Sequence, residues 1–296
     1  MVYSYSLFGL IVQCDFCIPF LQQYKNKIEA KFDVIIKHDS SIDFEKNLSL
    51  NETLSDLNLN IGNIENRYYK CRIINGHRIE YKFKDKSNNI SLLINFLHMP
   101  FAFLMFQNGY LPLHGMSFLH NKKTVISLGM SGCGKSSLSS SLSATHKIRS
   151  EDITCTIYKN NKIYSMPSFP ITLSEENYSE HLEKHSLEKI SRERVINCLK
   201  DSYDNKKLIQ VKRLYILEWG NCEKIIKLKD SEALKKILIC SFKPYPFNSC
   251  IESEKIFFKN IMGLIRHNEI YLFTRKKDNN PSSQISLIKH LENDSS

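Results

Sequence analysis

Eight consecutive residues, from Gly129 to Ser136, constrain the fold of this chain more than any other segment. They read GMSGCGKS and match the pattern G-x-x-x-x-G-K-[ST] at every fixed position. An apolar, β-branched run, 124–128, precedes them, and a segment compatible with a helix, 136–144, follows. The pattern has structural meaning when a buried strand leads into it and a helix leads out of it. The sequence therefore predicts a strand–loop–helix unit within a fold of the α/β class.

Each fixed position of this loop has a physical role in binding phosphate. The glycines permit positive φ and close backbone approach, so successive N–H groups can surround an anion. The following helix points the positive end of its dipole at the same place. Lys135 is expected to reach the β- and γ-phosphates, and the Ser136 hydroxyl to bind magnesium. We therefore predict a site for a nucleoside triphosphate and Mg²⁺, formed by Gly129, Met130, Ser131, Gly132, Cys133, Gly134, Lys135, Ser136 and Ser137.

Two adjacent acids, Glu151 and Asp152, follow the loop within a segment expected as one strand, 148–158. Acidic side chains near an apolar strand are costly to bury unless something pairs with them. Beside a phosphate-binding loop the natural partner is magnesium. One acid could hold the metal while the other accepts a proton from an attacking hydroxyl. The alternative is a solvated strand end, because most charged side chains are exposed.

The first ninety residues are expected to be rich in strands. Asn75 and Gly76 separate two runs, 68–74 and 78–83. This dipeptide is typical of a two-residue hairpin, since type I′ turns need residues that tolerate positive φ. Residues 3–12 are expected as one strand. The polar stretch 39–66 is expected as a long loop or an irregular insertion.

A helix is expected over residues 90–108, and strands then alternate with helices as far as Arg275. We divide the chain into a strand-rich N-terminal region, residues 1–95, for substrate recognition or assembly, and a core, 96–275. A polar tail, 276–296, is expected to fray.

The charge balance restricts the partners of this protein only weakly. A formal net charge of +10 could indicate nucleic acid or an anionic surface. No block of five or six like charges occurs, so the lysines are interpreted as solvated surface residues. Neither nucleic acid nor a membrane is expected as a partner.

The cellular setting is inferred from the apolar runs and the cysteines. The longest apolar run, 92–106, is interrupted by Asn95, His98 and Pro100 and is too short to cross a bilayer. No signal peptide is visible. Nine cysteines without a framework spacing indicate reduced thiols and a cytoplasmic protein.

Three elements in order resemble the HPr kinase/phosphorylase family, and beyond it the nucleotide-binding fold shared with ATP-dependent phosphoenolpyruvate carboxykinase. The family has a histidine–glycine pair, a hydrophobic strand, the loop G-x-S-G-x-G-K-S, a helix and paired acids. In this chain these are Leu113-His114-Gly115, Val125–Leu128, Gly129–Ser136 and Glu151-Asp152. The resemblance implies an α/β (α+β) class, with a mixed-sheet P-loop core beside the strand-rich N-terminal region.

The chain is more similar to a divergent branch, the HPr-kinase-like proteins of peptide biosynthesis clusters such as those for lasso peptides. The similar segments are 5–12 with 18–21, the lead-in 109–114, the late strand 214–217 and the helix 233–238. Members of this branch phosphorylate a serine of a precursor peptide. The resemblance therefore implies a peptide or protein partner with an acceptor serine.

The resemblance also implies roles for individual residues. Asp152 would be the principal acid, near the metal and the acceptor, and Glu151 stands where the family usually has an aspartate. His114 would lie close to the γ-phosphate or the metal, and Lys135 would bind phosphate. Ser136 and Asp152 would hold Mg²⁺. Ser137 replaces an acid of HPr kinases proper, which argues against HPr as the substrate. Related kinases are often oligomeric, so a homo-oligomer is implied.

The hypothesis is phosphoryl transfer from ATP to a hydroxyl, in which positioning and charge supply most of the rate. A small-molecule hydroxyl kinase would keep every role and change only the acceptor. A non-catalytic nucleotide sensor would need no base, and an ATPase acting on nucleic acid would need a basic cluster. An assisting arginine is expected, and the sequence does not choose among Arg192, Arg194, Arg213, Arg266 and Arg275.

Overall fold

The computed structural model of this protein describes most of the chain, namely residues 1–26, 31–42, 61–66, 68–84, 90–169, 171–175, 188–191, 194–198, 208–242, 251–276 and 282–293. Some of the sequence predictions concern residues outside these ranges. Residues 43–60 of the polar stretch and the candidate Arg192 lie outside the described residues, as does the side chain of Arg194.

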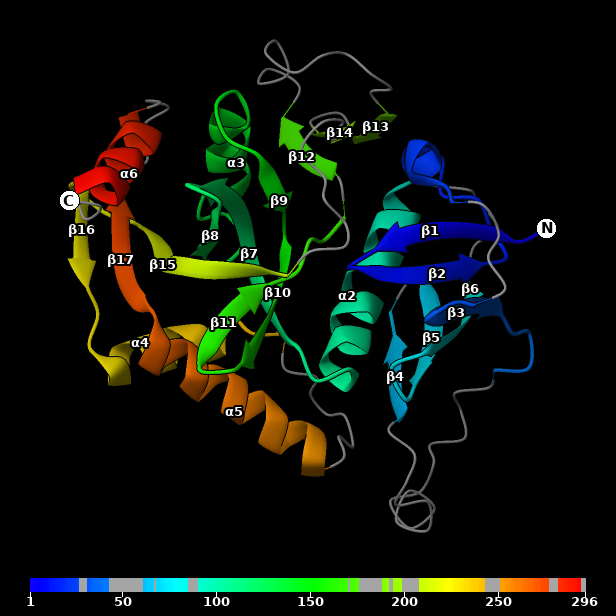
Figure 1. The fold of residues 1–296 in the computed structure, drawn as a ribbon. Helices are drawn as coiled ribbons and strands as arrows, with labels where there is room; N and C mark the ends of the chain where they lie inside the picture. Colours follow the sequence, from blue (N-terminus) through cyan, green and yellow to red (C-terminus); the bar gives the residue numbers. More distant parts are fainter. Residues whose placement is uncertain are drawn as a thin grey trace.

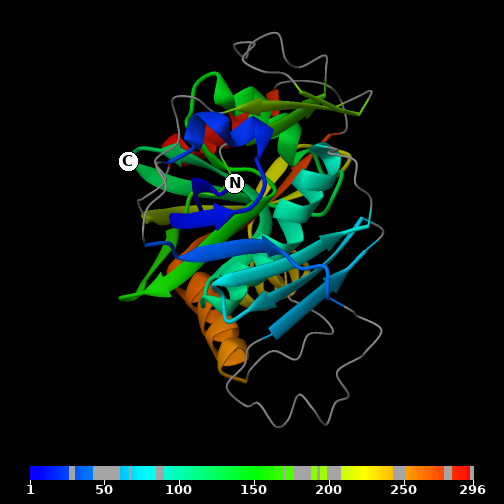
Figure 2. The ribbon, with the colours of Figure 1, turned by 90° about the vertical axis from the view of Figure 1, so that its right-hand side faces the viewer.

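The N-terminal region forms a mixed sheet in the order β1-β2-β3-β6-β5-β4. Its strands are β1 (Tyr3–Leu7), β2 (Leu10–Cys14), β3 (Val34–His38), β4 (Ile61–Glu65), β5 (Tyr69–Ile74) and β6 (Arg78–Phe83), and a short 3₁₀ helix, η1 (Pro19–Tyr24), follows β2. β3 is parallel to both neighbours and the other pairs are antiparallel. Figure 2 looks onto this sheet.

Two hairpins in this sheet test the sequence predictions. The hairpin between β5 and β6 is confirmed, with Asn75 and Gly76 at φ of 51° and 70°. The single strand predicted over residues 3–12 is wrong. Phe8 and Gly9 adopt φ of 53° and 70°, and the chain reverses there to pair β1 with β2. β4 likewise adds a strand at the end of the expected polar loop.

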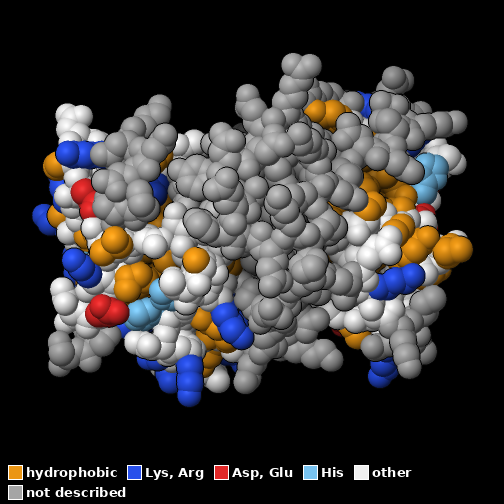
Figure 3. All heavy atoms as spheres, turned by 90° about the horizontal axis from the view of Figure 1, so that it is seen from above, with side chains coloured by type: hydrophobic (Ala, Val, Ile, Leu, Met, Phe, Trp, Pro, Cys, Tyr) orange, Lys and Arg blue, Asp and Glu red, His pale blue; other side chains and the backbone are white. Residues whose placement is uncertain are grey.

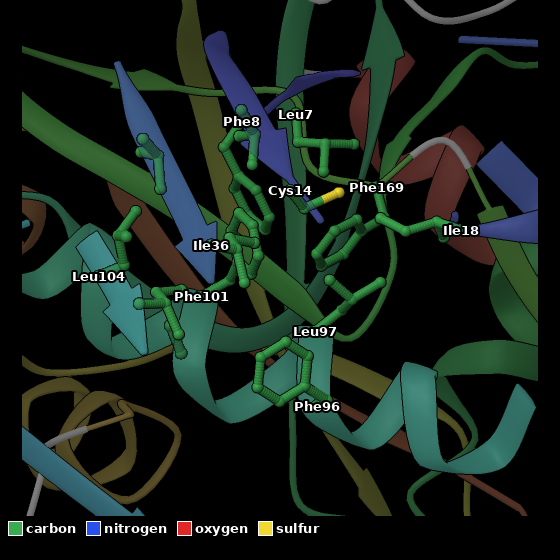
Figure 4. Close-up of a cluster of buried hydrophobic side chains, with 14 of the residues drawn as sticks. Leu7, Phe8, Cys14, Ile18, Ile36, Phe96, Leu97, Phe101, Leu104 and Phe169 are labelled. Carbon is green, nitrogen blue, oxygen red and sulfur yellow. The ribbon is translucent and has the colours of Figure 1, made fainter. Parts of the chain in front are cut away.

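The predicted helix is confirmed as α2 (Ile90–Gln107), which lies between the two large sheets (Figure 1). Its apolar side chains join those of the first sheet in a buried cluster that includes Phe8, Ile36, Phe96 and Phe101 (Figure 4). α2 crosses the boundary we predicted at residue 95 and joins the N-terminal region to the core. None of the described helices, α2 included, has the length and apolar character needed to cross a bilayer.

The second sheet is also mixed and follows the order β11-β10-β7-β8-β15-β17-β16, with β9 beside β7. Its strands are β7 (Leu111–His120), β8 (Lys123–Leu128), β9 (Ile148–Ser150), β10 (Ile153–Lys159), β11 (Lys162–Ser165), β15 (Ile209–Trp219), β16 (Lys224–Lys227) and β17 (Glu269–Arg275). β15 runs parallel to β8 and β17, and the other pairs are antiparallel. The fold is thus mixed α/β with sheets of mixed strand orientation.

Helices cover the second sheet on both sides (Figure 1): α3 (Lys135–Ser143) and α6 (Ser282–Asn293) on one, α4 (Asp230–Ile239) and α5 (Ile251–His267) on the other. A small sheet contains β12 (Ile171–Glu175), β13 (Glu188–Ser191) and β14 (Arg194–Cys198). The tail expected to fray differs from prediction, because α6 buries Leu287 and Leu291 completely. Two apolar residues four positions apart form one face of a helix, which outweighs the polar composition.

The described lysine and arginine side chains are scattered over the face seen in Figure 3, without a single basic patch there.

Candidate active site

The glycine-rich loop lies between a strand and a helix, as the sequence predicts: β8 ends at Leu128 and α3 begins at Lys135. Gly134 has φ of 82°, in the left-handed region that favours glycine. A Cβ at this position would lie 2.7 Å from a guanidinium nitrogen of Arg275 and 2.9 Å from the Trp219 ring. The backbone conformation and the side chains behind the loop therefore both require glycine here.

Lys135 is buried in the loop, with 7% of its surface exposed. Its ammonium donates hydrogen bonds to the carbonyl oxygens of Gly129, at 2.8 Å, and Met130, at 3.1 Å. An ammonium has three N–H donors. No carboxylate among the described residues forms an ion pair with it, and a buried cation costs free energy unless it is paired. The lysine is therefore suited to an anionic ligand.

The first turn of α3 presents further donors. Its N-terminal cap is Gly134, which has no side chain to cap the helix. The first N–H groups of a helix lack intrahelical partners and attract anions. Ser136 and Ser137 are exposed in this turn, as a metal-binding hydroxyl must be, while the Cys133 thiol is buried against Leu138 and its neighbours.

The acid pair occupies a turn instead of the strand interior we predicted. The chain leaves β9 at Ser150 and enters β10 at Ile153. Asp152 has φ of 69°, and the Ile153 N–H donates to the Glu151 carbonyl at 2.8 Å. A left-handed backbone is uncommon outside glycine, although aspartate tolerates it better than most residues, and such positions cluster at functional sites. This turn leaves Asp152 partly exposed, whereas Glu151 is 6% exposed.

A different histidine lies against each carboxylate oxygen of Asp152, and His114 donates a hydrogen bond to one of them. His114 Nε2 lies 3.0 Å from Oδ1, and His98 Nδ1 lies 3.0 Å from Oδ2. Burial alone would raise the pKa of Asp152, but the His114 hydrogen bond, together with His98 and Lys135, lowers it to about 2. The carboxylate is therefore ionised at neutral pH and can only accept, so His114 must donate through Nε2.

His98 reaches this carboxylate from α2, a different element from those that carry the rest of the site. Burial lowers the pKa of His98, Asp152 opposes this effect, and His114 adds to it. Sequence reasoning missed His98 as a functional residue. The available signal was a polar side chain that interrupts an apolar helix two residues before Pro100.

The strands connect the acid cluster to the loop. Gly129 N–H donates to the His114 carbonyl at 3.3 Å, so the first loop residue is bonded to the residue that holds Asp152. His114 on β7 pairs in turn with Ile153 on β10. Strands in a sheet are about 4.8 Å apart, so two spacings place the start of β10 roughly 10 Å from the loop. This separation is suitable for a ligand that contacts both.

The described arginines that were candidates for assisting the phosphate site differ in their surroundings. Arg213 pairs with Glu269 at 2.6 Å, and Arg266 is exposed at the end of α5. Arg275 contacts the loop directly, because its Nη2 donates to the Cys133 carbonyl. The predicted Lys135, His114 and Asp152 are thus brought together with His98 and Arg275.

Comparisons with known proteins do not assign this chain to a family. The chain matches no family model and no curated protein. Among solved structures it is similar to the HPr(Ser) kinase/phosphatase from Coxiella burnetii, with a TM-score of 0.35 and 11% sequence identity over 62% of this chain and 97% of that chain. A TM-score this low does not establish a shared fold, so the assignment of a function depends on the residues of this chain.

Proposed function

We propose that this protein is a kinase that transfers the γ-phosphoryl group of ATP, with Mg²⁺, to the hydroxyl of a serine in a peptide or protein. The observation that carries the proposal is the buried Lys135. Its ammonium is held by two backbone carbonyls, forms no ion pair with a described carboxylate, and lies at the start of a helix with uncapped N–H groups. A buried cation beside a helix N-terminus is an arrangement that favours phosphate.

The residues present fit a nucleotide with its magnesium ion. Mg²⁺ in nucleotide sites keeps several waters and takes only one or two protein oxygens besides the phosphates. The exposed Ser136 hydroxyl and the ionised Asp152 carboxylate would supply these oxygens. When bound, the ion would neutralise charge on the phosphates. Lys135 and the helix N–H groups would hold the same oxygens.

Asp152 is the residue of the acid pair suited to act on the acceptor. It is partly exposed, ionised and fixed by two histidines, so it can orient a hydroxyl by accepting its hydrogen bond. Orientation and electrostatic stabilisation supply most of the rate in phosphoryl transfer. The buried Glu151 is less accessible to a substrate. The proposal of a seryl acceptor comes from the resemblance of the whole motif set.

The experiment that tests this function is a transfer assay with MgATP and three classes of acceptor: degenerate seryl peptides, free serine and sugars. Mass spectrometry would detect the gain of one phosphoryl group. Lys135→Ala and Asp152→Asn should each abolish the gain, while the exposed Lys122→Ala and Asp230→Asn should retain it. Phosphorylation that persists in Lys135→Ala would contradict the proposed site. Transfer to a sugar but to no peptide would contradict the proposed acceptor.

A further inference from the structure

Two side chains at the ends of neighbouring parallel strands contact the back of the loop. Trp219 on β15 and Arg275 on β17 are aligned in register. The Trp219 Nε1–H donates to the Gly132 carbonyl at 2.7 Å, and Arg275 Nη2 donates to the Cys133 carbonyl. The guanidinium lies 4.7 Å from the centre of the indole ring, within cation–π distance. The carbonyl oxygens of two consecutive loop residues, Gly132 and Cys133, thus accept hydrogen bonds from side chains on the same side of the loop.

Arg275 is unusual because its charge is buried and forms no ion pair with any residue that the structure describes. Its side chain is 3% exposed, and no carboxylate in the described part of the chain forms an ion pair with it. Its Nε is buried without a hydrogen-bond partner among the same residues. Burial lowers the pKa of this arginine, and the charge of Glu223 only partly opposes that effect. A charge kept buried at such a cost needs an explanation beyond packing.

Peptide geometry connects Arg275 to the ligand side of the loop. The C=O and N–H of a trans peptide point in opposite directions. With the Cys133 carbonyl bonded to Arg275, the N–H of Gly134 points away from the guanidinium, towards the side of the loop where phosphate would bind. A hydrogen bond to a charged donor is stronger than a neutral one and polarises the peptide. The Gly134 N–H therefore becomes a better donor.

Trp219 acts on the preceding peptide as a neutral donor. It holds the Gly132 carbonyl, and the Cys133 N–H of that same peptide closes the turn on the Met130 carbonyl at 3.2 Å. Met130 also accepts from Lys135. The tryptophan thus fixes the turn, while the arginine fixes and polarises the next amide.

We propose that Arg275 is a positioning residue for nucleotide phosphates, which acts through the Cys133–Gly134 peptide without touching the ligand. This inference rests on the proposed function, because it assumes that the loop binds phosphate. It answers the question that the sequence left open, namely which arginine assists. Arg275 lies directly against the loop backbone, because a Cβ at Gly134 would be 2.7 Å from its Nη2.

The test compares three variants by calorimetric titration with MgADP. Arg275→Met removes the charge and the donor while it fills much of the volume, and we expect its affinity to fall about tenfold or more, as for loss of a charged hydrogen bond. Arg275→Lys keeps a charge and a donor and should recover most of the affinity. Arg275→Gln keeps a neutral donor and should fall between them. Thermal unfolding of the same samples reports stability separately.

The outcomes separate the two proposals. MgADP affinity in Arg275→Met equal to that of the parent, or lost equally in Arg275→Lys and Arg275→Met, would overturn the role of Arg275 and leave the proposed function intact. Failure of the parent itself to bind would overturn both. The chain has a single tryptophan, so Trp219 emission provides a second readout in the parent protein, and it should change on addition of MgADP.

Discussion

The loop and the acid cluster are assembled in opposite ways. The loop is contiguous in sequence, from Gly129 to Ser136, and its lysine bonds to its own backbone. The acid cluster draws Asp152 from a turn, His114 from β7 and His98 from α2, which also packs on the first sheet. The loop is therefore set by local geometry, whereas the acid cluster exists only when distant segments fold together.

Because the two regions are built differently, nucleotide binding and phosphoryl transfer should be separable by mutation. Changes in the loop should alter nucleotide affinity, since Lys135 and the helix N–H groups face the phosphates. Changes in the acid cluster should alter mainly the transfer step, since Asp152 would orient the acceptor hydroxyl.

Asp152→Asn should lower the rate of transfer by about 10³-fold, the scale of a positioned acid–base group. The amide keeps the size of the side chain but removes the charge that both histidines bind. MgATP affinity should fall by no more than about tenfold, because the phosphates and Ser136 still hold the ion. Single-turnover assays beside binding titrations measure the two quantities. If binding is lost together with transfer, the two regions are not separable.

Gly134→Ala should weaken MgATP binding by about 100-fold. Alanine is strained in a left-handed backbone, and its Cβ would also clash with Arg275 and Trp219. Gly132→Ala is a matched control. Its φ of 80° imposes the same strain, yet nothing lies within 4 Å of its Cβ. The difference in affinity between the two variants isolates the contact behind the loop. Equal losses would mean that only backbone strain matters.

His98→Leu should lower transfer about tenfold through loss of the polar contact between Nδ1 and the Asp152 carboxylate, with nucleotide affinity unchanged. His98→Asn should retain most of the activity, because its amide nitrogen occupies nearly the same place as Nδ1. Steady-state kinetics of the two variants makes the comparison. An equal loss in both would show that His98 acts by packing.

The low pKa of Asp152 predicts a small effect of pH on stability. A folded value of about 2 against an ordinary 3.8 means that the ionised carboxylate stabilises the fold above pH 3.8, and that this is lost as the pH falls towards 2. The side chain is 31% exposed, so we expect about 1 kcal/mol after screening. The difference in unfolding free energy between the parent and Asp152→Asn should shrink over this pH range. A constant difference would contradict the assignment.

Much of the loop side could be predicted from sequence, because a strand, two glycines and a lysine at fixed spacing define it locally. The acid cluster could be predicted only in part. The adjacent acids were visible, but the left-handed turn at Asp152 gave no signal beyond their polarity. His98 and Arg275 could not be assigned, because their contacts depend on α2 and β17 reaching residues 54 and 142 positions away. The hairpin at Phe8 was missed since only Gly9 marked it.

The most direct test of the account is a set of three binding isotherms for MgATP, with the parent, Lys135→Ala and Asp152→Asn. We predict that the parent binds, that Lys135→Ala binds at least about 100-fold more weakly after loss of its charged hydrogen bonds to phosphate, and that Asp152→Asn still binds, with a loss no greater than about tenfold from its one metal contact. Binding by Lys135→Ala at the affinity of the parent, or no binding by the parent at all, would contradict the claim that this loop is a phosphate site.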